Sequence, residues 1–262
     1  MSEGLDPRML LRGYAAGIFP MADSRDAGDI FWVEPRNRAI IPLETFHLSR
    51  SLAKRVRSGR FTVTRDCAFH EVLLACAERE ETWINQVIER ATLGLHAVGH
   101  AHSIECWREG RLVGGLYGVK LGRAFFGESM FSRMTDASKV ALAWLVARLR
   151  VGHFSLLDCQ FMTPHLASLG AMTVSRDRYV GLLTTALSAG AGGGVSAGSV
   201  PLATGASLVE GAPPPDFEAL DRLLEVARAT GAAGPAGQLI AQLLGQTSYT
   251  GSSTTLSDGL SL

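Results

Sequence analysis

A carboxylate and an amide stand one residue apart at the end of an apolar segment. Asp158 and Gln160 follow the run F-S-L-L, with Cys159 between them. Because side chains alternate along a strand, Asp158 and Gln160 would share one face while Cys159 points to the other. A carboxylate beside an amide can orient a nucleophile and help to remove its proton. A polar strand end that only caps a neighbouring loop explains the same pattern equally well.

A second carboxylate lies in apolar surroundings. Glu128 belongs to G-E-S-M-F-S, residues 127–132, and follows two phenylalanines. Burial of an unpaired carboxylate costs on the order of several kcal/mol, so we expect a partner. The pattern favours a structural ion pair with Arg123 or Arg133, and a substrate amine or hydroxyl is the alternative.

A thiol nucleophile is a competing interpretation of the same region. Cys159 with His153 or His165 would have the required residue types, but the strand alternation turns the sulfur away from the polar pair. The chain has four cysteines, none in a C-x-x-C pair, which disfavours disulfides and structural zinc: Cys67, Cys76, Cys106 and Cys159.

Two further patterns suggest ligands that we do not expect. The histidine run that contains His96, His100 and His102 resembles a metal motif, but Gly99 would interrupt the helix that aligns it. The run G-G-L-Y-G at residues 114–118 lacks the G-K-[S/T] ending of a phosphate-binding loop. We interpret it as a strand bend.

Positive charge is concentrated locally, although the chain has 25 basic and 25 acidic residues and a net charge of zero. Residues 46–65 contain no acidic side chain. Ser49 can cap a helix there with one apolar face and an opposite face that carries Arg50, Lys54 and Arg57. Such a stripe is usually a solvated helix face, and contact with RNA phosphates is the alternative.

Tryptophans at the edges of expected elements are candidates for stacking on a base. Trp32 and Trp83 both have such positions, whereas Trp144 lies inside an apolar helix and is expected in the core.

Helices on both sides of a central group of strands must position these residues. Asp66 and Asp136 are expected to cap the helices that follow them. Helices are expected at residues 7–15, after Ser49, and at 69–76, 84–98 and 140–149, and strands at 31–35, 61–65, 102–107, 112–119, 123–128 and 154–158. Consecutive strands with a turn at residues 108–111 indicate an antiparallel meander and an α+β fold.

The composition changes after Ser188. Gly/Ala-rich runs predict a linker, two helices at residues 217–229 and 238–244 are expected to dock on the main body, and residues 248–262 are expected to be disordered. The sequence contains neither a stretch of about 20 apolar residues nor a signal peptide, so we expect a cytoplasmic protein without a membrane span.

Eight segments together resemble the bacterial leucyl/phenylalanyl-tRNA protein transferases. They occur in that family's order at compatible spacing between residues 10 and 179, which makes the combination specific. The segments are Y-A-A-G-I-F-P (14–20), T-W-I (82–84), G-H-A-H-S-I-E-C-W (99–107), L-V-G-G-L-Y-G-V (112–119), G-E-S-M-F-S (127–132), A-S-K (137–139), D-C-Q (158–160) and S-L-G-A (168–171).

The resemblance implies a domain organisation. A small N-terminal domain would span residues 1–35. A domain similar to the GCN5-related N-acetyltransferase fold, with a central mostly antiparallel sheet flanked by helices, would span residues 36–188. Residues 189–262 would be a Gly/Ala-rich linker and a partly disordered C-terminal extension with little family counterpart.

The resemblance also implies a reaction. Such enzymes move leucine or phenylalanine, and less readily methionine, from aminoacyl-tRNA to proteins that begin with Arg or Lys, which creates an N-degron. Because the ester is already activated, the enzyme mainly positions the amine, removes its proton and stabilises the oxyanion. The resemblance implies no metal and no cofactor, and we expect a monomer.

The same resemblance assigns roles to residues of this chain. Gln160, oriented by Asp158, would act on the attacking amine, and Glu128 would fix the substrate. The terminal adenosine would be held by Trp32 and Trp83. The aminoacyl pocket would be lined by Leu116, Phe125, Met130 and Leu157, and the tRNA phosphates would contact Arg50, Lys54 and Arg57.

Two other functions remain as alternatives. An acyl-CoA-dependent N-acyltransferase would need an R/Q-x-x-G-x-G/A loop for the pyrophosphate, and the nearest glycine, Gly122, has Val119 three residues before it. The other is an RNA-binding module built around the basic helix. In such a protein, substitution of Asp158 or Gln160 would have no effect on function.

Overall fold

A seven-stranded sheet forms the centre of the molecule. The computed structural model describes residues 5–79, 81–188, 213–230 and 234–245. The strand order is β4-β5-β6-β7-β8-β3-β9, and a separate two-stranded sheet joins β1 and β2. The strands are β1 (Phe19–Met21), β2 (Phe31–Val33), β3 (Asn37–Ile41), β4 (Thr62–Arg65), β5 (Ala101–Arg108), β6 (Arg111–Leu121), β7 (Ala124–Ser132), β8 (Leu156–Gln160) and β9 (Met172–Ser175).

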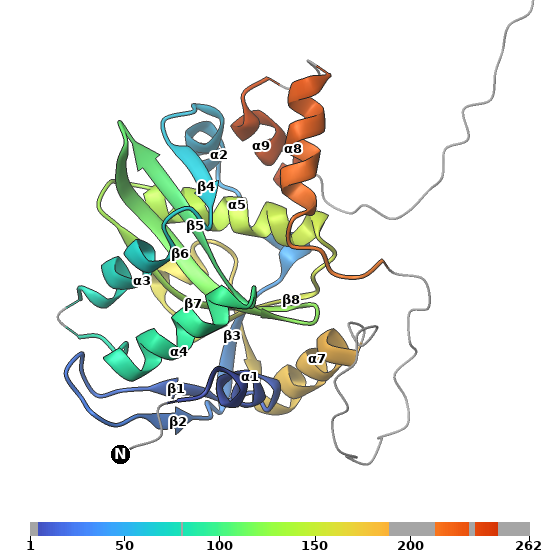
Figure 1. The fold of residues 1–262 in the computed structure, drawn as a ribbon. Helices are drawn as coiled ribbons and strands as arrows, with labels where there is room; N and C mark the ends of the chain where they lie inside the picture. Colours follow the sequence, from blue (N-terminus) through green and yellow to red (C-terminus); the bar gives the residue numbers. More distant parts are fainter. Residues whose placement is uncertain (1–4, 80, 189–212, 231–233, 246–262) are drawn as a thin grey trace, which may run out of the picture.

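Helices cover both faces of this sheet (Figure 1). One hydrophobic core lies under α1, α3, α4 and α7, and the other under α2, α5, α8 and α9. The bounds are α1 (Pro7–Ala15), η1 (Leu43–Thr45), α2 (Arg50–Arg57), α3 (Phe69–Ala77), α4 (Gln86–Ala97), α5 (Ala137–Val151), α6 (Pro164–Ala167), α7 (Arg176–Ser188), α8 (Ala219–Ala229) and α9 (Ala236–Gly245). The expected α+β fold with a mostly antiparallel sheet is confirmed.

One pair of strands breaks the antiparallel pattern and opens the sheet. All neighbours in the main sheet are antiparallel except β7 and β8. This parallel pair is in register only from Ala124 opposite Leu156 to Phe126 opposite Asp158. Both strands continue beyond this point, β7 to Ser132. The two strands therefore separate there, and unpaired edges of this kind leave room for a ligand.

Several local expectations were wrong. Asp66 does not cap α3; its backbone has a φ of 57°, and its carboxylate accepts hydrogen bonds from His102 and from the Ser103 amide. Asp136 makes no side-chain cap at α5 and pairs with Arg55 instead. The strands β3 and β9 and the helix α7 were not anticipated, because each strand is short and pairs with residues far away in the sequence.

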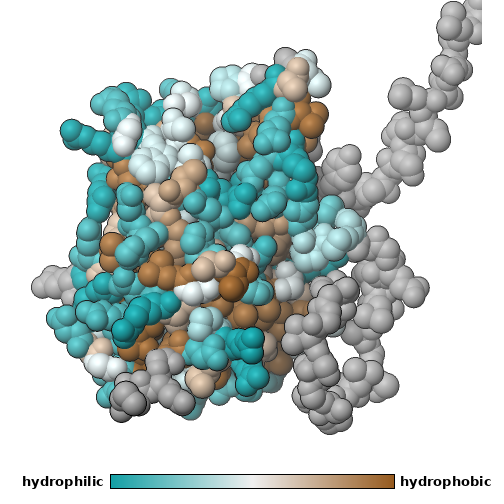
Figure 2. Space-filling view, in the orientation of Figure 1, coloured by the Kyte–Doolittle hydropathy of each residue, from teal (hydrophilic) through white to brown (hydrophobic). Residues whose placement is uncertain are grey.

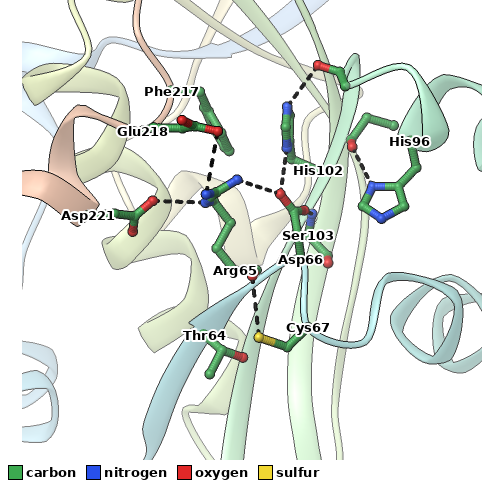
Figure 3. Close-up of polar contacts among 12 residues, drawn as sticks. Thr64, Arg65, Asp66, Cys67, His96, His102, Ser103, Phe217, Glu218 and Asp221 are labelled. Carbon is green, nitrogen blue, oxygen red and sulfur yellow. Dashed lines mark hydrogen bonds and ion pairs between the residues drawn. The ribbon is translucent and has the colours of Figure 1, made fainter.

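The C-terminal helices are part of the core on the α5 side. Phe217 is 2% exposed, and the ring of Phe125 stacks on it with 5.5 Å between centroids. Asp221 pairs with Arg65 at 2.9 Å (Figure 3). It also pairs with Arg148 at 2.5 Å. The expected docking of two helices is confirmed. The predicted linker after Ser188, up to residue 212, and residues 248–262, for which the sequence predicts disorder, lie outside the described residues.

One face of the molecule is largely polar. On the face drawn in Figure 2, hydrophilic residues predominate and hydrophobic residues reach the surface mainly as small patches near its middle. Within the described ranges, no helix combines the length and apolar character needed to cross a membrane.

Candidate active site

A cavity of about 520 Å³ lies where β7 and β8 separate. Its lining comes from both hydrophobic cores, so it passes through the gap in the sheet. Trp83 and Phe19 belong to the core under α1 and α4, whereas Leu116 and Leu157 belong to the core under α5. The cavity therefore has one end on each side of the sheet.

The end on the α5 side is apolar. Leu116, Met130 and Leu157 line it as expected from the sequence. Leu116 pairs with Met130 across β6 and β7, which places both side chains on one face. Three leucines that we did not anticipate also line it: Leu142, Leu145 and Leu166. The first two come from the apolar helix α5, whose long hydrophobic pattern pointed only to a core position.

Phe125 does not line the cavity, contrary to expectation. Its side chain is fully buried and stacks on Phe217 from the C-terminal segment. Phe125 thus faces the same core as Met130 but lies near the start of β7, where the C-terminal segment covers it.

Glu128 lies in a β-bulge at the polar edge of the cavity. Tyr117 pairs with Ser129 and Gly118 with Gly127, so Glu128 is the extra residue of β7. Bulges commonly turn a side chain towards a functional site. The Glu128 carboxylate accepts a hydrogen bond of 2.9 Å from the Gln160 amide and another from the Tyr14 hydroxyl.

The ion-pair interpretation of Glu128 is therefore wrong. Arg133 pairs with Glu78, and Arg123 donates to the carbonyl oxygen of His153. Burial, reinforced by the negative charge of Asp158, raises the pKa of Glu128 to about 7. A carboxyl group in this state changes its charge near neutral pH.

Asp158 lies behind the cavity wall rather than in it. Its side chain is fully buried and pairs with Arg38 through Nη2 to Oδ2 at 2.6 Å and Nε to Oδ1 at 2.9 Å. The Tyr179 hydroxyl donates to Oδ2 at 2.8 Å. The backbone N–H of Gln160 donates to Oδ1, also at 2.8 Å. Asp158 thus holds the residue whose side chain enters the cavity.

The expected alternation at the end of β8 is wrong. Gln160 has a φ of 55°, in the left-handed region, and its side chain lines the cavity together with Cys159. A non-glycine residue in this conformation is strained by about 1–3 kcal/mol, and such strain persists where the surroundings hold it. The hydrogen bond from Gln160 to Asp158 supplies that constraint.

Arg38 was missed by sequence reasoning. It is 1% exposed, and its guanidinium lies between the rings of Phe19 and Tyr179, at 4.6 and 4.5 Å from their centroids. The only signal in the sequence was an arginine directly before the apolar run A-I-I. Nothing local indicated a partner 120 positions away.

The two tryptophans differ in position. Trp83 lines the cavity. Trp32 does not belong to the lining and packs against Gly13 of α1, where a Cβ atom would come within 2.2 Å of its ring. The structure therefore brings Trp83, but not Trp32, to the cavity.

Cys159 lines the cavity, as does His165, so both components of the thiol alternative are near the candidate site. Burial raises the pKa of the Cys159 thiol far above its usual value, and the charge of Asp158 acts in the same direction. Reactive cysteines have lowered pKa values, because the thiolate is the nucleophile. The environment of Cys159 thus opposes a nucleophilic role.

The histidine run is divided among separate partners (Figure 3). His96 contacts the carbonyl oxygen of Ala101, and His102 contacts Asp66 at 2.7 Å. His100 contacts the carbonyl oxygen of Lys120. In the ranges that the structure describes, no three potential ligands are grouped so that they could hold a metal ion.

The basic stripe is exposed on α2. Ser49 caps this helix by accepting from the Leu52 amide at 3.2 Å, as expected. Arg50, Lys54 and Arg57 are exposed, whereas Leu52 is buried. None of the three basic residues lines the cavity.

The pKa of Glu128 predicts how stability depends on pH. The folded-state pKa of about 7 lies above the ordinary value of 4.5, so the folded protein binds the proton more tightly. The contribution of Glu128 to the free energy of unfolding is complete below pH 4.5 and is lost as the pH rises through 7. Glu128→Gln should remove this loss and stabilise the protein at pH 8, relative to pH 4.5, by on the order of 2 kcal/mol.

Denaturant unfolding of both proteins at pH 4.5 and pH 8 measures this difference. Glu225→Gln on the exposed surface of α8, outside the cavity lining, is the matched control for the loss of one carboxylate. A Glu128→Gln effect of equal size at both pH values would contradict the prediction.

Comparisons with known proteins agree on one family. The family model described as leucyl/phenylalanyl-tRNA protein transferase matches residues 40–184, and the model of that family's N-terminal domain matches residues 3–36. The leucyl/phenylalanyl-tRNA–protein transferase of Rhizorhabdus wittichii is 61% identical over 94% of this chain and all of the relative. The protein of the same name from Zymomonas mobilis is 60% identical over 72% of each chain.

A solved structure, L-PGS from Bacillus licheniformis, is 13% identical and has a TM-score of 0.35, covering 62% of this chain and 55% of the other. A similarity at that level supports no conclusion. The family models and the close relatives, by contrast, extend over the strands and helices that form the cavity. The chain belongs to the leucyl/phenylalanyl-tRNA protein transferase family.

Proposed function

We propose that this protein transfers leucine or phenylalanine from aminoacyl-tRNA to the N-terminal residue of acceptor proteins. The observation that carries the proposal is an apolar cavity with a hydrogen-bonded Gln160 and Glu128 at its edge. An apolar side chain of the donor fits the end lined by leucines and Met130. The reacting ester would then lie beside the polar edge. Membership of the family supports the same assignment.

The reaction needs positioning more than activation. The amine of the acceptor attacks the ester carbon, a C–N bond forms, and the ester C–O bond breaks to release the tRNA hydroxyl. Gln160 would contact the amine and Asp158 would orient Gln160 through its backbone N–H. Glu128 would fix the substrate, and a carboxylate with a pKa near 7 is suited to accept a proton at neutral pH.

We propose that the terminal adenosine stacks on Trp83, which lines the cavity, with Trp32 supporting the neighbouring helix α1. The exposed stripe of Arg50, Lys54 and Arg57 would contact tRNA phosphates. Such contacts position the tRNA without reading its sequence.

The substrate range follows from the cavity lining. The flexible thioether of Met130 would allow the cavity to accept leucine, phenylalanine and, less readily, methionine. Acceptors that begin with Arg or Lys would yield an N-degron product. We propose that the enzyme acts as a monomer in the cytoplasm.

We propose the division of the chain into residues 1–35, 36–188 and 189–262 on the same basis. The separate sheet of β1 and β2 supports a small N-terminal unit, and β3 of the main sheet begins at Asn37. The mostly antiparallel sheet flanked by helices is compatible with a fold similar to the GCN5-related N-acetyltransferases. An acyl-CoA donor is not favoured, because the turn at Gly122 packs against Ala186 and Leu187.

Transfer of radiolabelled leucine from Leu-tRNA to a protein beginning with Arg tests the function. A matched protein beginning with Met is the control, and labelled acetyl-CoA is offered as an alternative donor. We expect label only on the Arg protein and only from Leu-tRNA. Equal labelling of both proteins, labelling of neither, or labelling from acetyl-CoA would contradict the proposal.

A further inference from the structure

An arginine lies beside Trp83 at the cavity. Arg79 follows α3, and its guanidinium carbon lies 5.8 Å from the centroid of the Trp83 ring. Both side chains line the cavity. Arg79 is exposed, and its Nη2 donates a hydrogen bond to the carbonyl oxygen of Met130. The guanidinium is therefore held at the cavity by one backbone contact and one aromatic contact.

Among the described residues, no carboxylate pairs with the guanidinium of Arg79. Across the described part of the chain, no acidic side chain lies within 4.0 Å of its guanidinium. Two other arginines differ in this respect: Arg133 pairs with Glu78, and Arg38 pairs with Asp158. Among the described residues that line the cavity, Arg79 is the only arginine or lysine.

The combination of an aromatic face and an adjacent guanidinium suits the end of a single nucleic acid strand. Aromatic rings stack on bases, and arginines beside them bind the connecting phosphates. A guanidinium has five N–H donors in a planar fork that matches phosphate oxygens. The bond to Met130 uses one nitrogen of Arg79 and leaves the others available to a ligand.

We propose that Arg79 binds the phosphodiester between the last two nucleotides of the aminoacyl-tRNA, while Trp83 stacks on the terminal base. This inference rests on the proposed function and adds a phosphate subsite to it. The competing explanation is that Arg79 only supports the Met130 carbonyl and so maintains the shape of the aminoacyl end.

Two donors separate these explanations. Leu-tRNA carries the phosphodiester, whereas leucyl-adenosine, an ester of the nucleoside, carries no phosphate. Arg79→Ala should lower kcat/KM for Leu-tRNA about tenfold or more, because a charge-assisted contact is lost. For leucyl-adenosine the change should be less than about twofold, because no transition-state contact is removed. Arg228→Ala is the control. It removes an exposed charge in α8, outside the cavity lining, and should change neither value.

The salt dependence of transfer and inhibition by short nucleotides give two further tests that do not use leucyl-adenosine. The slope of log kcat/KM against log salt for Leu-tRNA should become shallower by about 0.7 in Arg79→Ala, the loss of one single-strand phosphate contact. The trinucleotide CCA should inhibit the variant about tenfold less well, whereas adenosine should inhibit both proteins equally.

Equal fractional losses with both donors, or an unchanged salt slope and unchanged inhibition by CCA, would overturn the phosphate subsite. Failure of the wild-type protein to transfer leucine from either donor would instead count against the proposed function. The two failures are therefore distinguishable.

Discussion

Asp158→Asn is expected to lower the free energy of unfolding by about 3–5 kcal/mol. The substitution keeps the shape of the side chain but removes the charge opposite Arg38, which is 1% exposed. Arg38 would then be a buried cation without its carboxylate partner, left with neutral contacts such as the Gly17 carbonyl oxygen and two aromatic rings. Removing one member of a buried pair is far more costly than the pair itself is stabilising. Equilibrium unfolding in urea measures the loss.

An exposed ion pair is the matched control. Glu34 pairs with Arg176, and their side chains are 49% and 51% exposed. Glu34→Gln should change the free energy of unfolding by less than about 1 kcal/mol, because solvent screens such pairs. Similar small losses in the two variants would show that Asp158 is not the buried partner that the structure describes.

Part of the candidate site could be predicted from the sequence and part could not. The strands β5 to β7 and the helix α5 have long regular patterns, so their positions followed from the sequence. Glu128 and Gln160 were recognised as polar residues in apolar surroundings. Their mutual hydrogen bond depends on a bulge in β7 and on the divergence of β7 from β8. Neither feature has a local signal.

The errors share a physical cause. The alternation rule assigned Gln160 to the face of Asp158, but Gln160 adopts a left-handed conformation and lines the cavity together with Cys159. Phe125 was assigned to the cavity because Phe217, which covers it, lies 92 residues later in the sequence. In both cases a contact with a distant part of the sequence overrides the local pattern. Gln160 is held by Asp158, which pairs with Arg38. Phe125 is covered by the C-terminal segment.

Gln160→Ala is expected to lower the single-turnover rate of leucine transfer by about 100-fold or more, the usual range for a group that handles the transferred proton. The side-chain amide donates a hydrogen bond to Glu128 at the polar edge of the cavity. The backbone N–H of this position would still donate to Asp158, because alanine retains it. The free energy of unfolding should therefore change by less than about 1 kcal/mol.

Cys159→Ala is the matched control, because it changes the adjacent residue in the same cavity wall. Its thiol is held in the protonated form by burial, so transfer should be retained within about threefold. Rates measured with saturating Leu-tRNA and an acceptor that begins with Arg separate the two variants. Loss of transfer in Cys159→Ala, with transfer retained in Gln160→Ala, would reverse the assignment. The sulfur would then be required for the reaction, and the thiol would be the reactive group.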